Sequence, residues 1–253
     1  MIPFRLALIG LLAAAPAVAQ GQSGILSAEQ RHAIEGVMRD YLLKNPDVVQ
    51  DALTELERRQ QEAQKATQAI TLREERDHLI NSPNDYVIGN PAGDVTLVKF
   101  FDYNCPYCRK AKSDVDVLIK GDPQLRVVLK EFPVLGAAST DASRVAVAAK
   151  RDLPAGKLRE FHAKLMETRG RADGDRALAV AKDFGLDPEK LRKHMQDQAV
   201  AAVLRENAAL ADKLGITGTP AFVLNDGVIA GAVGAEALQR AIANIRACEK
   251  LSC

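Results

Sequence analysis

The stretch FFDYNCPYCRK, residues 100–110, contains two cysteines, Cys105 and Cys108, with two residues between them and an apolar run before them. A pair with this spacing can bind a metal, form a structural disulfide or carry out reversible redox chemistry. Each possibility requires a different setting in the chain. The sequence on both sides of the pair therefore decides between them.

The setting favours redox chemistry. Residues 94–103, DVTLVKFFDY, predict a strand, and a helix is predicted from Cys105 to Gly121. A sulfur at a helix start faces free backbone N–H groups and the positive end of the helix dipole, and both favour the thiolate. Cys108, one turn further along, can then attack a mixed disulfide formed at Cys105. We expect the intervening Pro106 and Tyr107 to tune the redox potential.

Two other roles for the pair are weaker. A zinc site could combine Cys105 and Cys108 with Cys248 and Cys253, but the second pair lies at the chain terminus, where ordering is unreliable. A purely structural disulfide between Cys105 and Cys108 would close so small a loop that it would stabilise the fold little. We therefore prefer a redox pair, with no metal or other cofactor.

The first twenty residues predict an export signal. Arg5 precedes an apolar run from Leu6 to Ala15, and Ala17-Val18-Ala19 has the small-x-small pattern that signal peptidase recognises. The run is too short for a membrane helix, which needs roughly 18 apolar residues. We expect a soluble periplasmic protein, cleaved after Ala19.

The charge balance argues against nucleic acid as a partner. Removal of Arg5 with the signal lowers the 34 Lys and Arg residues by one, which matches the 33 Asp and Glu residues. A net charge of zero gives no support for binding nucleic acid or a charged membrane. Four cysteines are also too few for a scaffold held together by disulfides.

Residues 20–80 predict a helical oligomerisation stalk and linker. Ser27 and Gln30 form a capping box before one helix, and Asn45-Pro46 starts a second. Apolar residues recur at helical spacing in both, but each stripe is too small to stabilise an isolated helix. The simplest partner for these stripes is another copy of the chain.

The segment that follows is polar on all sides. Residues 57–79 are strong helix formers with almost no large apolar residue between Leu56 and Ile70. Such a helix is either a solvated spacer, which we prefer, or an exposed helix lying on the main domain. Residues 81–94 predict a turn-rich boundary.

Residues 81–253 predict an α/β catalytic domain. The strand at 94–103, the helix from Cys105 and a strand at 124–134 form a right-handed parallel unit. Residues 139–214 predict a helical insertion. Two short strands around Asn225-Asp226-Gly227 then predict a hairpin, and a last helix runs from Ala235 to about Cys248.

This order of segments, with CPYC at 105–108 and TP at 219–220, resembles a thioredoxin fold of the DsbA type over about residues 85–247. The resemblance implies that Cys105 is the nucleophile and Cys108 the resolving cysteine. It also implies that Pro220 is a cis-proline facing the cysteines, and that Thr219 tunes the site and helps to bind the backbone of a substrate peptide.

The N-terminal part is similar to the ScsC group of DsbA-like proteins, the suppressor-of-copper-sensitivity disulfide isomerases. The similarity lies in VMRDYLLKNPDVVQDALTELERRQ (37–60) and in SPNDYVIGNPAGDVTLVKFFDYNCPYC (82–108). It implies a trimer that shuffles wrong disulfides in exported proteins, kept reduced by a membrane-bound ScsB-like reductase, with a link to copper tolerance. Threonine before the cis-proline also resembles the isomerase branch.

Two other functions stay open at this point. A DsbA-like oxidase would use the same dithiol to introduce disulfides. A periplasmic copper- or zinc-binding protein would use the thiolates as soft metal ligands.

One residue departs from the family pattern. Many members of the family have an acid six positions before the first cysteine, where this chain has Lys99. The lysine either reaches solvent at a loosely covered strand face or points beneath the cysteines. In the second case its charge would stabilise a thiolate, and the carboxylate proton shuttle would be absent.

Cys248 and Cys253 form a possible second disulfide. They are five residues apart, too distant to bond within a continuous helix, so an intrachain clip requires the helix to end at Cys248. An intermolecular bond or free thiols are the alternatives. Glu131 receives no role, and the four histidines are treated as ordinary surface or helix residues because they lack ligand spacing.

Overall fold

The computed structural model describes residues 26–253, and the expected export signal and its cleavage site lie outside these residues. The chain divides into two compact units, one up to Arg58 and one from Arg59 to Cys253. Helix α2 (Pro46–Glu74) contributes residues to both.

The first unit consists of α1 (Ala28–Lys44) and the beginning of α2. The predicted capping box is present: the Gln30 N–H donates to Ser27 Oγ at 3.1 Å, and the Ser27 N–H donates to Gln30 Oε1 at 2.8 Å. No residue of α1 is buried. Six large apolar side chains of α1 are exposed, namely Ile34, Val37, Met38, Tyr41, Leu42 and Leu43. Within residues 26–253, this stripe lacks the partner that it needs.

The second unit begins in the polar part of α2. Residues 59–67 are exposed, as expected for a helix that is polar on all sides. The last turns behave differently, because Gln68 Nε2 donates to the Leu214 carbonyl at 2.8 Å and Leu72 is buried. These turns lie on the main domain, as the alternative sequence interpretation required, and α3 (Arg76–Ile80) follows them.

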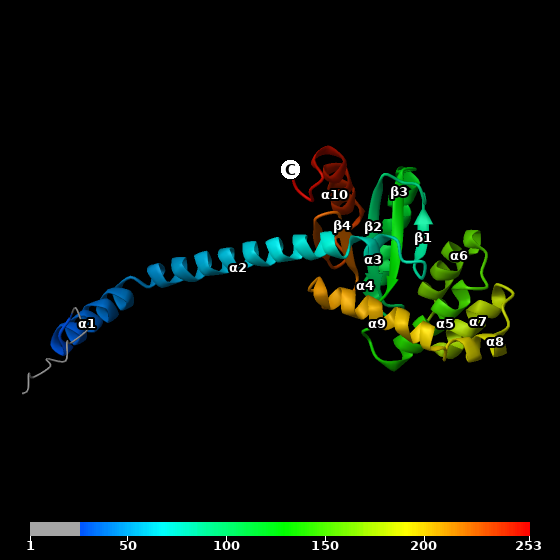
Figure 1. Ribbon diagram of the computed structural model, residues 1–253, viewed down its shortest axis with the longest axis horizontal. Helices are drawn as coiled ribbons and strands as arrows, with labels where there is room; N and C mark the ends of the chain where they lie inside the picture. The colour runs from blue at the N-terminus through cyan, green and yellow to red at the C-terminus, as the bar shows by residue number, and fades with distance from the viewer. Residues whose placement is uncertain (1–25) are drawn as a thin grey trace, which may run out of the picture. The chain divides into compact units, whose positions relative to one another are not determined.

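A five-stranded mixed sheet forms the centre of this unit, in the order β1-β3-β2-β4-β5 (Figure 1). Strands β2 (Val95–Phe101) and β3 (Leu125–Glu131) are parallel, and the other neighbouring pairs are antiparallel. The predicted hairpin is formed by β4 (Ala221–Leu224) and β5 (Gly227–Ala230).

Strand β1 (Tyr86–Gly89) corrects the prediction that residues 81–94 form only a turn-rich boundary. It pairs with β3, with Val87 opposite Val128. Turn-forming residues flank β1 on both sides, and four residues are too few to give a clear alternating pattern. Tertiary pairing with β3 therefore decides the conformation of this segment.

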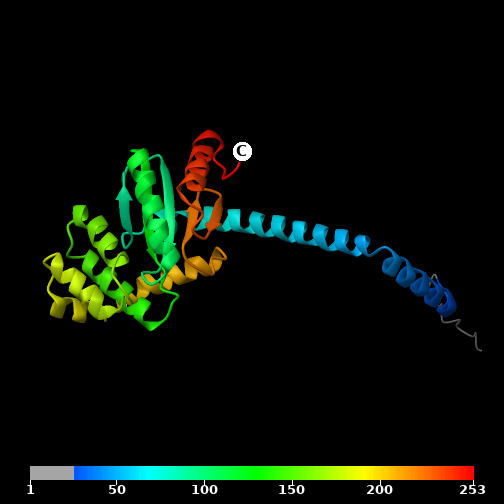
Figure 2. The same cartoon turned by 180° about the vertical axis from the view of Figure 1, so that it is seen from behind.

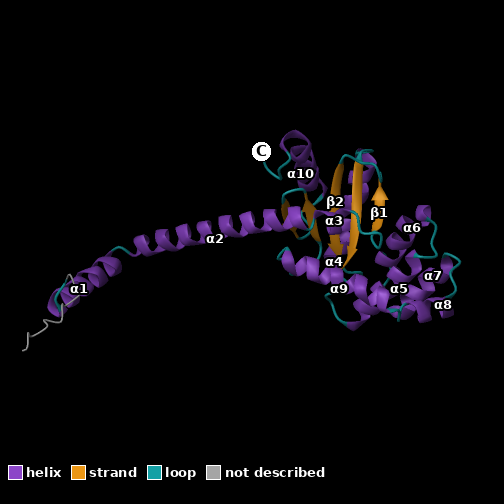
Figure 3. Ribbon diagram, in the orientation of Figure 1, coloured by secondary structure: helices purple, strands orange, loops and turns teal. Residues whose placement is uncertain are grey.

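Helices cover both faces of the sheet (Figure 3). The predicted insertion at 139–214 is helical, and it comprises α5 to α9. Helices α4 to α10 are α4 (Pro106–Gly121), α5 (Ala137–Lys150), α6 (Ala155–Met166), α7 (Gly174–Asp183), α8 (Pro188–His194), α9 (Gln198–Lys213) and α10 (Ala235–Cys248).

The residues of β2 alternate between the two faces. Leu97 and Phe101 belong to a core that includes residues of α4, α5, α6 and α10. Val98 and Phe100 belong to a second core, built with residues of α2, α3 and α9. Lys99, between them in the sequence, therefore lies on the face that α4 covers.

The C-terminal segment is held by a disulfide to the end of α10 and by a hydrogen bond to the hairpin. Helix α10 ends at Cys248, the next residue adopts a positive φ of 61°, and Cys248 bonds Cys253 with an S–S distance of 2.03 Å. The Leu251 N–H donates to Asp226 Oδ1 at 2.9 Å, which ties the tail to the turn between β4 and β5. Figure 2 shows the tail beside this hairpin from behind. The intrachain bond also contradicts the four-cysteine zinc site, because it occupies two of the four sulfurs.

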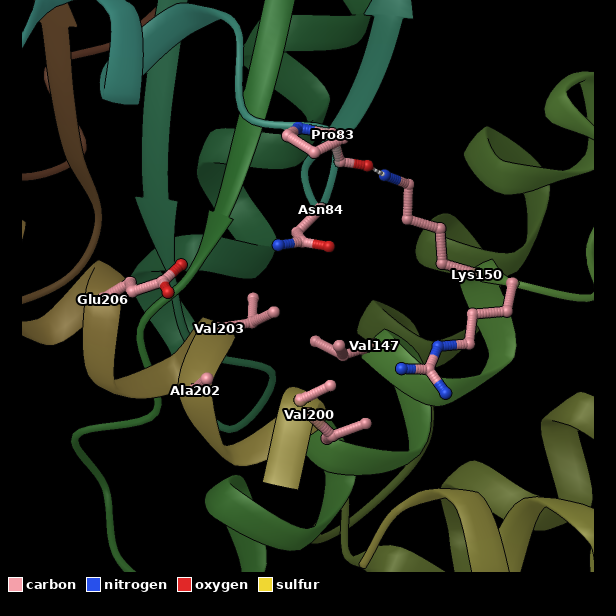
Figure 4. Close-up of a pocket in the computed structure, with 10 residues that line it drawn as sticks. Pro83, Asn84, Val147, Lys150, Val200, Ala202, Val203 and Glu206 are labelled. Carbon is pink, nitrogen blue, oxygen red and sulfur yellow. Dashed lines mark hydrogen bonds between the residues drawn. The ribbon is translucent and has the colours of Figure 1, made fainter. Parts of the chain in front are cut away.

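A pocket of about 390 Å³ lies between α5, α9 and the segment before β1 (Figure 4). Lys150 Nζ donates to the Pro83 carbonyl at its edge. The pocket is lined by residues of 83–84, 147–151 and 199–206. It includes neither the cysteine pair nor the segment around Pro220, so it is separate from the thiol chemistry. Among residues 26–253, no helix is both long and apolar enough to cross a membrane.

Candidate active site

Cys105 occupies the N-cap position of α4. Pro106 begins the helix, and the Cys108 N–H donates to Cys105 Sγ at 3.3 Å. The sulfur thus accepts one of the N–H groups that a helix start leaves unpaired. A negative charge on this sulfur is favoured by that contact and by the helix dipole. The structure places Cys105 where the sequence predicted it.

The peptide bond between Thr219 and Pro220 is cis, as the sequence predicted. The Thr219 carbonyl accepts a hydrogen bond from Cys105 Sγ at 3.1 Å. Two segments 114 residues apart therefore meet at the reactive sulfur. This contact places a stretch of irregular backbone beside the sulfur, where a bound polypeptide could lie.

Cys108 lies in the first turn of α4 and is fully buried, whereas Cys105 is 4% exposed. Burial raises the pKa of the Cys108 thiol to about 12, because a thiolate in an apolar layer loses its hydration. Cys108 is therefore a thiol at neutral pH. It can act as a nucleophile only if a group in its surroundings takes its proton.

Lys99 points beneath the cysteines, and the alternative in which it reaches solvent is wrong. Its side chain lies in the apolar layer under α4 with 1% exposure. Lys99 Nζ donates to the Cys108 carbonyl at 3.4 Å. Burial lowers the pKa of the Lys99 amine to about 8, although the two cysteines and Asp116 oppose this shift.

Glu131, which received no role in the sequence analysis, is buried near this site at the end of β3. Tyr103 Oη and Ser143 Oγ donate to its two carboxylate oxygens at 2.9 and 2.6 Å. Burial raises the pKa of Glu131 to about 8 despite these two donors. The sequence contains a pattern that could have predicted this burial, because Glu131 shares one face of the strand with the apolar residues Val127 and Leu129.

His162 is the one histidine that lies in this buried layer. Its Nδ1 is 3.4 Å from Tyr103 Oη, and its ring packs edge-on against Phe101. Burial lowers the pKa of His162 to about 3, so the ring is neutral at physiological pH. The sequence predicts an ordinary surface or helix residue at His162; it does lie in a helix, α6, but it is buried.

Exposed apolar side chains lie on segments that adjoin the dithiol and the cis-proline. They come from three loops or helix starts: Tyr107, Val134, Leu135 and Val233, with exposures of 66, 42, 47 and 41%. Two hydrogen bonds hold the loops in place, from the Leu135 N–H to Asp102 Oδ2 and from the Gly231 N–H to the Pro220 carbonyl, at 2.9 and 2.8 Å. Among residues 75–253, the only other large apolar side chain this exposed is Val117. We call these four residues the apolar rim.

A dithiol at a strand-to-helix junction, facing a cis-proline in a five-stranded mixed sheet, defines a thioredoxin fold, and the helical insertion defines its DsbA-like form. The chain belongs to the DSBA-like thioredoxin domain family, which matches residues 96–243 and whose members are thiol-disulfide oxidoreductases. The copper resistance protein ScsC N-terminal domain matches residues 30–63, which places the chain in the ScsC group.

Solved structures agree with this assignment. A thioredoxin-like oxidoreductase from Silicibacter pomeroyi is 45% identical, with a TM-score of 0.65 over 68% of this chain and 98% of that one. A linker-deletion mutant of Proteus mirabilis ScsC is 27% identical, with a TM-score of 0.67 over 89% of this chain and 99% of that one.

Two curated relatives differ in length from this chain. Disulfide bond formation protein D of Bacillus subtilis is 29% identical over 161 residues, which cover 56% of this chain and 68% of that protein. Na(+)/H(+) antiporter NhaA 1 of Salinispora arenicola is 29% identical over 163 residues, or 64% of this chain. The chain spans only 25% of the antiporter's length.

The buried carboxyl of Glu131 predicts a pH-dependent stability. Its pKa is about 8 in the folded protein and close to the ordinary value of 4.5 in the unfolded chain. The contribution of Glu131 to the free energy of unfolding is fully present below about pH 4.5 and is lost as the pH rises through 8. Between these values the free energy of unfolding should fall by up to about 1.4 kcal/mol per pH unit. Glu131→Gln should remove this slope. Urea unfolding of both proteins across this range measures the difference.

The prediction concerns the difference between the stability curves of the unchanged protein and of Glu131→Gln. Burial also shifts the pKa values of Asp85 and His162, and both residues remain in the variant. Their contributions cancel when one curve is subtracted from the other. Parallel stability curves for the two proteins would contradict a carboxyl that is protonated in the folded state.

Proposed function

We propose that the protein is a periplasmic disulfide isomerase that acts on exported proteins through the Cys105-Pro106-Tyr107-Cys108 dithiol. The observation that carries this proposal is the position of Cys105 Sγ, at the start of α4 and 3.1 Å from the carbonyl before the cis-proline. A reactive sulfur is thereby placed beside backbone that can bind a polypeptide. Membership of the ScsC group supports the isomerase direction and the periplasmic location.

The reaction exchanges disulfides without net oxidation. The Cys105 thiolate attacks one sulfur of a substrate disulfide, forming a mixed disulfide and releasing the other substrate sulfur as a thiolate. A different substrate thiolate then attacks the mixed disulfide, forms the new substrate disulfide and releases Cys105. If no substrate thiolate arrives, Cys108 displaces the substrate and leaves the pair oxidised. A membrane-bound reductase of the ScsB type would then restore the dithiol.

The apolar rim supports unfolded polypeptides as substrates. Misoxidised chains expose apolar side chains that folded proteins bury, and the rim provides exposed apolar surface on three segments that adjoin the dithiol and the cis-proline. Thr219 and Pro220 would contact the peptide backbone, while the rim would contact side chains near the disulfide. Such contacts do not depend on a particular sequence, which suits an enzyme that acts on many exported proteins.

Replacing rim residues should weaken binding of peptides and leave the thiol chemistry intact. With Leu135→Ser combined with Val233→Ser, we expect the KM for a disulfide-containing peptide to rise about tenfold, since apolar anchors are often worth more than 1 kcal/mol each. Neither residue lies between the cysteines, and the reaction with oxidised glutathione, too small to reach the rim, should keep its rate. Val117→Ser, at an exposed position further along α4, is the control.

An unchanged KM in the double variant, or an equal effect of Val117→Ser, would contradict the rim as a peptide-binding surface. Stopped assays that quantify the remaining substrate disulfide provide the rates for all three proteins.

The exposed stripe of α1 supports an oligomer, for which we favour a trimer. An isomerase gains from several dithiols around one substrate, because wrong disulfides at different places can be attacked while the chain remains bound. The ScsC N-terminal domain covers this part of the chain. Burial of the stripe between copies would remove apolar side chains such as Val37 and Leu43, which are 70 and 73% exposed, from water.

Charges in this stripe should separate isomerase from oxidase activity. We expect Val37→Asp combined with Tyr41→Asp to give a monomer, because buried unpaired carboxylates are strongly unfavourable in an apolar interface. Isomerase activity should fall by about tenfold or more, while oxidation of small dithiols by the disulfide form stays unchanged. Light scattering measures the mass, and Arg39→Asp, on the same helix, is the control for added negative charge.

The second candidate is a thiol oxidase, which the similarity to disulfide bond formation protein D of Bacillus subtilis favours. An oxidase needs only one dithiol per substrate. Full activity on folding substrates in the monomeric variant would therefore reject the isomerase in favour of the oxidase.

A further inference from the structure

We propose that Lys99 is the base that removes the proton from Cys108 when Cys108 displaces a substrate from Cys105. This inference deepens the proposed dithiol chemistry and rests on it. Lys99 could instead act only through its positive charge, by stabilising a thiolate. Substitutions distinguish this electrostatic role from the role of a base.

Lys99 lies directly beneath the cysteine pair. Lys99 lies on the face of β2 that α4 covers, and its Nζ reaches the carbonyl of Cys108 itself, at 3.4 Å. Both side chains are buried, with exposures of 1 and 0%. Bulk water therefore has little access to the Cys108 sulfur. A proton that leaves this sulfur needs an acceptor inside the protein.

The Lys99 amine has few hydrogen-bond partners. An ammonium group has three N–H donors, but in the described part of the chain Lys99 Nζ has one hydrogen-bond acceptor, the distant Cys108 carbonyl. A buried ammonium with two unpaired donors is unfavourable. The neutral amine needs fewer acceptors, and its lone pair is free to take a proton.

The pKa values are consistent with this assignment. Burial lowers the pKa of Lys99 to about 8 and raises that of Cys108 to about 12. Near neutral pH a useful fraction of Lys99 is thus a neutral amine, while Cys108 is a thiol. Transfer of the proton gives an ammonium and a thiolate whose mutual attraction in a low-dielectric layer offsets part of the difference.

Other charged groups near Lys99 compete poorly as the base. On α4, Asp116 is paired with Lys112 at 2.9 Å and with Arg159 at 2.7 Å, and Cys105 is engaged with the substrate at this stage. On α6, burial holds the pKa of His162 near 3, so its ring binds a proton weakly. On β3, Glu131 also has a pKa of about 8, but its two carboxylate oxygens already accept hydrogen bonds from Tyr103 and Ser143. Lys99 Nζ, by contrast, contacts Cys108 itself.

Resolution by Cys108 moves one proton and exchanges one disulfide bond for another. The Cys108 S–H bond breaks and its proton passes to Lys99 Nζ. The Cys108 thiolate attacks Cys105 Sγ, the bond between the two cysteines forms, and the bond from Cys105 to the substrate sulfur breaks. The substrate leaves with the electron pair as a thiolate. The Lys99 ammonium then returns its proton to the leaving thiolate or to water.

The test isolates this step with dithiobis(nitrobenzoate), whose coloured leaving group remains a thiolate over the range used. The reduced full-length mature protein should release one leaving group at a rate that depends on reagent concentration, as Cys105 reacts. It should release the second at a rate independent of that concentration, as Cys108 resolves the mixed disulfide. Stopped-flow absorbance measures both phases from about pH 6 to about pH 10.

In the unchanged protein, the rate constant of the second phase should rise with pH and level off with a midpoint near the Lys99 pKa of about 8. Lys99→Met should lower it about 100-fold near neutral pH and make it climb without levelling off. Lys99→Arg keeps a positive charge but cannot lose a proton, so it should behave like Lys99→Met. Thermal melting shows whether each variant is folded, and Lys99→Gln replaces Lys99→Met if that variant is not.

Two results would overturn the proposal. Either Lys99→Met keeps the rate and pH profile of the unchanged protein, or Lys99→Arg restores them, in which case the charge alone matters. Failure of the dithiol function itself has a separate signature, because the unchanged protein would then lack the second phase altogether.

Discussion

The contact between Cys105 Sγ and the Thr219 carbonyl, 3.1 Å long, is the interaction on which the function of this structure depends. Strands β2 and β4 are neighbours, with Phe100 opposite Ala221, so the residues just beyond these positions meet at one edge of the sheet. The helix start then orients the sulfur, and the cis peptide bond presents the carbonyl. A rigid sheet thus holds the Cys105 sulfur and the backbone of the cis-proline segment together.

Beneath this contact, two ionisable groups lie on adjacent strands in the same apolar layer. Lys99 and Glu131 carry opposite charges when ionised, and burial moves the pKa of each to about 8. Near physiological pH, Glu131 is therefore mostly the neutral acid, while a fraction of Lys99 is the neutral amine. The apolar layer therefore contains groups that can gain or lose protons where thiol exchange requires it. Replacement of the usual acid by Lys99 changes the identity of the group under the cysteines but keeps it able to titrate.

The sequence predicted most of the elements that build the site, because they leave strong local signals. The turn residues around Asn225, the CPYC stretch at a strand end and the Thr219-Pro220 pair all mark backbone features directly. Strand β1 was not predicted from the sequence, because it is short and its conformation depends on pairing with β3. The positions of Lys99 and Glu131 stayed open because an isolated charge on a strand is compatible with either face, and only the packing of α4 and the insertion determines which is covered.

The most direct test of this account is the reactivation of scrambled ribonuclease by the reduced full-length mature protein. The account predicts recovery of ribonuclease activity, and it predicts that Cys105→Ser abolishes the recovery because the attacking sulfur is lost. No recovery with the unchanged protein, combined with rapid oxidation of reduced substrate thiols by its disulfide form, would contradict the isomerase and identify an oxidase.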